Sequence, residues 1–158
     1  MKLTAKTDLD VPAAQVYAIL ADFPAWEREG ARHGIVIEHP PATPLVGVGA
    51  EWKIQGPYRG KTRRLTLRME EMVQGKVLKA SIASAPADGI AGLEVIVLSP
   101  RRSRLRVEVE LKPRTLAARL FFNTLRLAKG RVQARFEARL GHVNARIREA
   151  YERGIKTV

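Results

Sequence analysis

Side chains able to do acid–base or metal chemistry are few in this sequence and lie far apart. It contains three histidines, His33, His39 and His142. None of them pairs with another histidine or with a carboxylate cluster at the spacing of a metal site. His33 and His39 flank a predicted strand, so their side chains could reach the end of an interior cavity. A loop histidine without a partner is usually solvated, and we expect no catalytic or ligand-binding role for them.

The adjacent Glu70 and Glu71 are the other candidates for acid–base chemistry. Successive side chains of a strand point to opposite faces, so only one of these two can point inward. A glutamate buried there could act as a general acid or base. The pattern favours instead an irregularity of strand register near the turn predicted at Gln74 and Gly75.

Several catalytic classes are absent from the sequence. The chain has no cysteine, which excludes disulfides, thiolate zinc sites, iron–sulfur ligation and cysteine nucleophiles. It also has no nucleophile elbow, phosphate-binding loop or dinucleotide fingerprint. The residues therefore assign no catalytic residue, no metal and no cofactor, and they leave open whether the protein is an enzyme.

The periodicity of the chain predicts the elements that must position any site. The 158 residues, 1–158, fit one domain. Residues 3–9 alternate as a strand with one buried face does. A short helix opens at 11–15, where Pro12 suits the first turn because its missing N–H would be unpaired there anyway. A second short helix at 25–28, a strand at 35–37 and a Pro/Gly-rich loop at 39–49 follow.

A run of strands comes next. Five segments alternate apolar and polar side chains, over residues 50–55, 64–70, 78–82, 93–97 and 104–111. Turns of hairpin length link them, so the sheet should be antiparallel. Each strand has one apolar and one charged face, so one side of the sheet meets water and the other side must be covered.

The C-terminal segment is expected to provide that cover. From residue 121 to 151 apolar side chains recur every three or four positions, which predicts one unbroken stripe on a long helix, with Gly130 as a point where it could kink. The start of this helix has a second apolar side, formed by Leu116, Leu120 and Leu127. A helix that is apolar on two sides is either buried on both of them or meets a partner, a lipid or a ligand.

The net charge of +12 is concentrated near the C-terminus. Residues 1–100 carry 12 Lys and Arg against 11 Asp and Glu, whereas residues 101–158 carry 16 against 5. A solvated, arginine-rich helix face is the ordinary explanation. An anionic membrane surface is a second candidate partner, with Phe122 entering lipid beside the three leucines and Arg119, Arg126 and Lys129 meeting headgroups. Nucleic acid is disfavoured, because the basic region has few aromatic residues for stacking and no recognisable motif.

Three local patterns match a known superfamily. Residues 11–22 (VPAAQVYAILAD) with Trp26 resemble the opening of START-like, or SRPBCC, proteins, which include polyketide cyclase/dehydrase-like and coenzyme Q-binding-like members. Residues 47–52 (GVGAEW) resemble the glycine-then-aromatic entry to the third strand, and the closing helix is similar to the one that grips the sheet. The resemblance implies an α+β helix-grip fold, in which a curved antiparallel sheet of about six or seven strands surrounds a long C-terminal helix, with two short helices after the first strand.

The resemblance also implies a deep cavity between sheet and helix that holds lipids, quinones, sterols or polyketides. The inward positions inferred here are mostly aliphatic, which suits a ligand held by burial of apolar surface. The expected ligand-binding residues are Trp52, Ile54, Tyr58, Leu67, Met69, Ile82, Val95, Val107, Phe121, Leu125 and Phe136. Phe23 and Trp26 are expected instead to anchor the two short helices.

Three functions follow from these patterns. The first is binding or transport of an apolar small molecule. The second is a cyclase or dehydratase enzyme, which needs at least one polar or ionisable side chain in the cavity; no catalytic set carries over from the superfamily. The third is peripheral association with an anionic membrane. The N-terminus has no apolar signal-peptide core, so we expect a cytoplasmic location; the oligomeric state stays open.

Overall fold

The computed structural model describes residues 1–156, and this part of the chain forms seven strands and four helices. The strands are β1 (Lys2–Leu9), β2 (Val36–Glu38), β3 (Glu51–Tyr58), β4 (Lys61–Val73), β5 (Val77–Ala83), β6 (Ala87–Ser99) and β7 (Arg102–Pro113). The helices are α1 (Ala13–Ala21), α2 (Phe23–Arg32), α3 (Leu116–Leu127) and α4 (Lys129–Lys156). Two short helices follow the first strand and a long helix closes the chain, as the sequence predicts.

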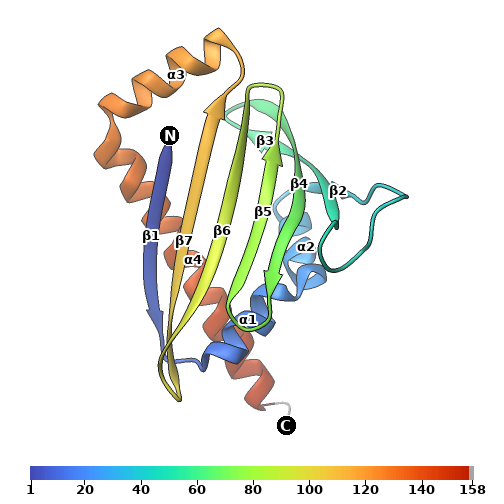
Figure 1. Ribbon diagram of the computed structural model, residues 1–158, viewed down its shortest axis with the longest axis vertical. Coiled ribbons are helices and arrows are strands. Elements are labelled where there is room, and N and C mark those ends of the chain that lie inside the picture. The colour runs from blue at the N-terminus through green and yellow to red at the C-terminus, as the bar shows by residue number, and fades with distance from the viewer. Residues whose placement is uncertain (157–158) are drawn as a thin grey trace.

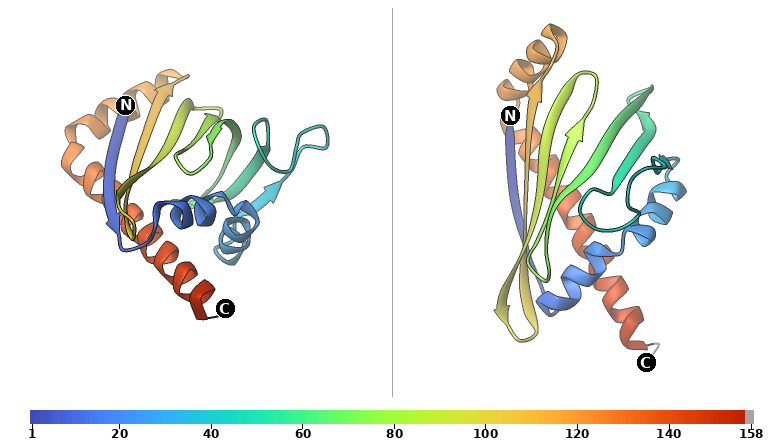
Figure 2. Two further views of the ribbon diagram at one scale, coloured as in Figure 1. Left: turned by 60° about the horizontal axis from the view of Figure 1, so that its bottom comes forward. Right: turned by 45° about the vertical axis from the view of Figure 1, so that its right-hand side comes forward.

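The seven strands form one antiparallel sheet in the order β1-β7-β6-β5-β4-β3-β2. The sheet curves, and α4 crosses its concave side diagonally, while α1 and α2 lie at one end of the same side (Figures 1 and 2). Only β1 is moved out of sequence order, because it pairs with the last strand, β7. The α+β helix-grip architecture is therefore confirmed.

A tight turn and a bulge set the register between β4 and β5. Gly75 has a φ of 76°, a left-handed conformation that glycine adopts without cost, and it lies in the turn between β4 and β5. The pairing of β4 with β5 shifts between Met69 and Glu71. This shift confirms the irregularity expected at the glutamate doublet. Beyond it Met72, paired with the buried Leu78, packs against the core, while Glu71 is exposed.

Two local contacts fix the short helices against each other. The Asp22 side chain accepts a hydrogen bond from the Ala25 main-chain N–H at 3.4 Å, as an N-cap residue does. The Trp26 indole Nε1 donates to the Ile19 carbonyl oxygen of α1 at 2.9 Å. Trp26 is therefore an anchor between α1 and α2, as predicted.

The C-terminal segment is two helices, so the prediction of one unbroken helix is wrong. Ala128 lies outside the helical region, at φ −107° and ψ 30°, and its N–H bonds to the Leu125 carbonyl, which ends α3. Gly130 lies within α4. Because the break lets α3 rotate independently, it is Phe122 that is buried and Phe121 that is 48% exposed, the reverse of the expected arrangement.

Helix α4 is held over the sheet by apolar packing and by two side-chain amides. Ile147 of α4 is fully buried in the core cluster. Gln133 Nε2 donates to the Thr4 carbonyl oxygen at 2.9 Å, and Asn144 Nδ2 donates to the Thr7 hydroxyl at 2.8 Å and to the Asp8 carbonyl oxygen at 3.1 Å. Within residues 1–156, no helix is long and apolar enough to cross a membrane.

An ion pair between the first and last strands makes stability depend on pH. Arg104 donates two hydrogen bonds to the Asp8 carboxylate, at 2.7 and 3.2 Å, and these lower the pKa of that carboxyl below its ordinary value of 3.8. A lowered folded-state pKa means that the stabilisation is present above the unfolded pKa and is lost as pH falls through the folded one.

We therefore expect Asp8→Asn to reduce the acid-induced loss of stability. Wild type should lose unfolding free energy below about pH 4, and the variant should lose less over the same range. Urea unfolding at a series of pH values measures this. Glu152→Gln, which removes a carboxyl from an exposed position of α4, is the control and should lose as much unfolding free energy in acid as wild type does. Equal acid sensitivity of Asp8→Asn and wild type would contradict the role of this pair.

Candidate ligand pocket

A pocket of about 520 Å³ lies between α4, the short helices and the concave face of the sheet. The sheet contributes Trp52 and Ile54 of β3, Leu67 and Met69 of β4, Ala80, Leu93 and Val107. The helices contribute Leu20, Phe23, Trp26, Phe136, Leu140 and Val143, and Ile35 and Ile37 close one side. The wall is almost entirely apolar, so the pocket suits a ligand that gains free energy by leaving water.

The hollow exists because small side chains lie in the middle of the concave face. Ala80 of β5 is paired in register with Ala91 of β6 on one side and with Met69 of β4 on the other. Larger side chains surround this position: Leu67 lies opposite Trp52, and Leu93 lies opposite Val107. The small side chain of Ala80 thus forms the floor of the pocket, below the larger side chains of its walls.

The structure brings six of the eleven expected ligand-binding residues together on this wall. They are Trp52, Ile54, Leu67, Met69, Val107 and Phe136. All but Phe136 come from strands whose alternation was read directly, and Phe136 lies on the stripe of α4 that faces the sheet.

The other five expected residues lie elsewhere. Tyr58 is 53% exposed, since it enters the β3–β4 turn. Val95 is buried in the core against α1 rather than in the pocket, and Ile82 lies next to Leu67 in register but outside the wall. Phe121 and Leu125 belong to α3, which the break at Ala128 separates from the helix that covers the pocket.

Sequence reasoning missed part of the wall. Phe23 and Trp26 were expected only to anchor the short helices, yet both also line the pocket. The Phe23 ring meets the Trp52 ring edge-on, with 5.0 Å between centroids. An aromatic side chain on a helix cannot be assigned to packing or to a cavity before the neighbouring strand is placed. The small size of Ala80 was the available signal for the floor.

One ionisable cluster borders the pocket. Glu27 of α2 lies on the wall, and its Oε1 accepts a hydrogen bond from the Trp52 indole Nε1 at 2.6 Å. The same oxygen lies 2.9 Å from His39 Nε2. A carboxylate paired with an imidazole is a group that can move protons. His39 was expected to be solvated, but its side chain is only 31% exposed, because Glu27 holds it beside Trp52.

A cation lies on the opposite wall. Arg139 is four positions before Val143 on the α4 face that lines the pocket, and its side chain reaches water. In the described part of the chain no carboxylate lies within ion-pair distance of its guanidinium, whereas Arg146, about two turns further along the same face of α4, pairs with Glu29. Arg139 is therefore available to an anionic group at the pocket.

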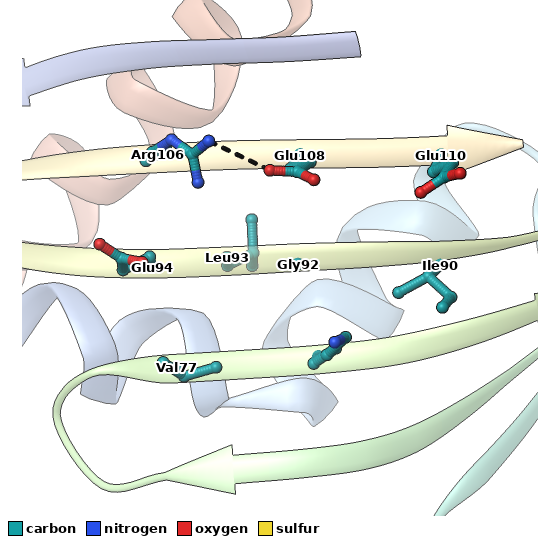
Figure 3. A pocket seen from close by; sticks show the side chains of 9 residues that line it. Val77, Ile90, Gly92, Leu93, Glu94, Arg106, Glu108 and Glu110 are labelled. Atoms are coloured by element: carbon teal, nitrogen blue, oxygen red, sulfur yellow. Dashed lines mark hydrogen bonds and ion pairs between the residues drawn. The ribbon is translucent and has the colours of Figure 1, made fainter. Parts of the chain in front are cut away.

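A second hollow, on the convex face of the sheet, has a different character. It lies over Gly92 of β6, whose missing side chain leaves a gap among charged neighbours (Figure 3). Glu94, Glu108 and Glu110 surround the gap, and Arg106 pairs with Glu108 at 3.1 Å. These charges are already solvated or paired, so this hollow offers little to an apolar ligand.

The sequence matches no protein-family model and no curated protein, so the comparison rests on solved structures. The protein TTHA0849 from Thermus thermophilus aligns over 95% of this chain and 99% of its own at 14% identity, with a TM-score of 0.68. A START superfamily protein from Mycobacterium smegmatis covers 85% of this chain and 95% of its own at 12% identity, with a TM-score of 0.55. The Zhui aromatase/cyclase from Streptomyces sp. R1128 covers 73% and 69% at 14% identity, with a TM-score of 0.55.

These likenesses define the class to which the architecture belongs. At such low identity these matches show similarity of fold alone. They agree with the order of elements, the curved sheet and the long helix α4 on its concave side described above. The chain has the START-like, or SRPBCC, helix-grip fold. The resemblance drawn from residues 11–22 and 47–52 is confirmed at that level.

Proposed function

We propose that this protein binds and carries an apolar small molecule, of the lipid, quinone, sterol or polyketide-like class, in the pocket under α4. One observation carries the proposal: an almost wholly apolar wall lines a solvent-open pocket of about 520 Å³ under α4. Pockets of roughly 300–1,000 Å³ with mostly apolar linings are typical of small-molecule sites. Because this pocket opens to solvent, its apolar wall meets water when empty, and an apolar ligand gains free energy by covering that wall.

The polar side chains of the wall favour an amphipathic ligand. Arg139 offers an unpaired cation to an acidic group at one end of the molecule, while the alanine floor and the aromatic wall take its apolar part. We further propose that the chain acts as a single ligand-binding domain, 1–158, in the cytoplasm. The lack of cysteine fits a reducing compartment.

The two tryptophans make ligand binding measurable without a label. The chain has only two, and both Trp26 and Trp52 line the pocket. We expect titration with a long-chain fatty acid, a quinone or a sterol to change intrinsic emission in a saturable way, because the ligand replaces water beside both indoles. Native mass spectrometry of the protein, followed by organic extraction, identifies any molecule that copurifies. Absence of both a saturable change and a retained molecule would count against the proposal.

An enzyme of the cyclase or dehydratase type is the second candidate. It is favoured by the Glu27–His39 pair, which places a proton-transferring group at the wall of the pocket. One of the solved structures with this fold is an aromatase/cyclase. Liquid chromatography with mass spectrometry of a polyketide-like substrate after incubation separates the two functions. A carrier returns the molecule at unchanged mass and retention time, a cyclase returns an isomer of equal mass at a different retention time, and a dehydratase returns a product lighter by one water.

A further inference from the structure

We propose that α3 docks the protein onto anionic lipid membranes, a role that goes beyond ligand binding in the pocket. The docking surface consists of Leu116, Leu120 and Leu127 of α3, together with Arg119 and Arg126 of the same helix and Lys129, the first residue of α4. No residue of α3 lines the pocket under α4, so docking and ligand binding use separate surfaces of the molecule.

The three leucines form an apolar line that residues 1–156 leave largely exposed. Their spacing of four and seven residues places them on one side of the helix, opposite the buried Ala118 and Phe122. They are 71%, 59% and 91% exposed, which is unusual for leucine on an ordered helix. The helix itself is well formed, since the Thr115 hydroxyl caps it by accepting a hydrogen bond from the Ala118 N–H at 3.1 Å.

The charge around this line has a single sign. Residues 111–136 contain seven Lys and Arg and no Asp or Glu. In the described part of the chain, Arg119, Arg126 and Lys129 have no carboxylate within ion-pair distance. An apolar line flanked by unpaired cations is the pattern of a helix that lies in the interface of an anionic bilayer, with leucines among the acyl chains and cations at the headgroups.

The position of α3 leaves it free to meet a flat surface. It projects past the end of the sheet where β7 finishes, at the far end of the molecule from α1 and α2 (Figures 1 and 2). A second copy of this chain is a poorer occupant. A two-fold interface sets the same patch against itself, which would bring the unpaired cations of one copy against those of the other.

Vesicle flotation tests the proposal with the full chain. Wild type should float with vesicles that contain phosphatidylglycerol and remain unbound with pure phosphatidylcholine, and binding should weaken as salt is raised. Replacing the three leucines together by serine should lower the partition coefficient about tenfold or more. Replacing Arg119, Arg126 and Lys129 by glutamine should have a similar effect on anionic vesicles.

Two matched variants make the result specific. Leu45→Ser, Val46→Ser and Val48→Ser remove three exposed apolar side chains from the β2–β3 loop and should leave flotation unchanged. Lys61→Gln, Arg63→Gln and Arg101→Gln remove the same charge from other exposed positions and should have a much smaller effect than the α3 charge variant. Circular dichroism and the pocket titration establish that every variant is folded.

Three outcomes would overturn the proposal. One is indifference of wild type to anionic vesicles. Another is flotation of the three-leucine variant as strong as that of wild type. The third is a dimer of wild type in sedimentation equilibrium that the leucine substitutions convert to a monomer, together with no binding of wild type to vesicles. That result would mean that the apolar line binds a second copy of the chain. A ligand titration that shows no binding, with flotation as expected, would contradict the proposed ligand pocket but not membrane docking.

Discussion

Replacement of Ala80 by phenylalanine is expected to abolish binding of apolar ligands while the protein remains folded. The Ala80 side chain forms the floor of the pocket, so a phenyl ring at this position would occupy the space that the ligand needs. Excluding a ligand from about 60 Å² of apolar wall costs about 1.5 kcal/mol, or tenfold in Kd, and a ring in the middle of the pocket should exclude more than that. Tryptophan emission during titration measures the affinity.

The control is Ala83→Phe on the same strand. Ala83 lies three positions further along β5, where the side chain points to the other face and is exposed. This variant should bind ligand as wild type does. If Ala80→Phe binds with unchanged affinity while its unfolding is cooperative, ligands do not use this pocket, and the proposed function is wrong. If Ala80→Phe fails to fold, the space between sheet and helix is smaller than the structure shows.

Replacement of Ile147 by alanine should cost about 2–5 kcal/mol of unfolding free energy, the largest stability effect that we predict. Ile147 is fully buried where α4 crosses the core, so the lost methyl and methylene groups leave a cavity that the surrounding strands cannot fill. Urea unfolding should show a lower midpoint with an unchanged dependence on denaturant concentration.

His142→Ala is the matched change on the exposed side of α4 and should shift the unfolding free energy by less than about 0.5 kcal/mol. An equally small effect of Ile147→Ala would mean that α4 does not pack against the sheet in solution. Since the pocket lies under the same helix, that result would contradict both the pocket and the packing of α4 against the sheet.

Most of the sheet was predictable because its two faces differ in every strand. In β7, Leu105 and Val107 alternate with arginines. If the pairing register of this strand shifted by one residue, its apolar side chains would point to the solvent-exposed face of the sheet. The break at Ala128 was not predictable by the same reasoning. Alanine is the best helix former, and Gly130 is the more obvious place for a break. The helix ends there because α3 packs its own buried face at the end of β7, a tertiary contact that local periodicity does not contain.

The pocket was predictable in its walls but not in its floor or its polar groups. Trp52, Leu67 and Val107 follow from strand alternation alone. The pairing of Ala80 with Ala91 depends on the register of two strands, which a turn or a bulge can shift by one residue. The contact of Glu27 with His39 joins a helix to a loop, and no spacing rule connects them.

The hydrogen bonds that side-chain amides of α4 donate to β1 also affect whether another molecule can add a strand to the sheet. Strand β1 is an edge of the sheet, and the free side of an edge strand is a template on which another chain can extend the sheet. Gln133 and Asn144 occupy the carbonyl oxygens of Thr4 and Asp8 with side-chain donors, so an incoming strand meets acceptors that are already engaged. The opposite edge, β2, has only three residues. Strand addition by another molecule thus meets two engaged acceptors at one border and a strand of only three residues at the other, and both features disfavour it.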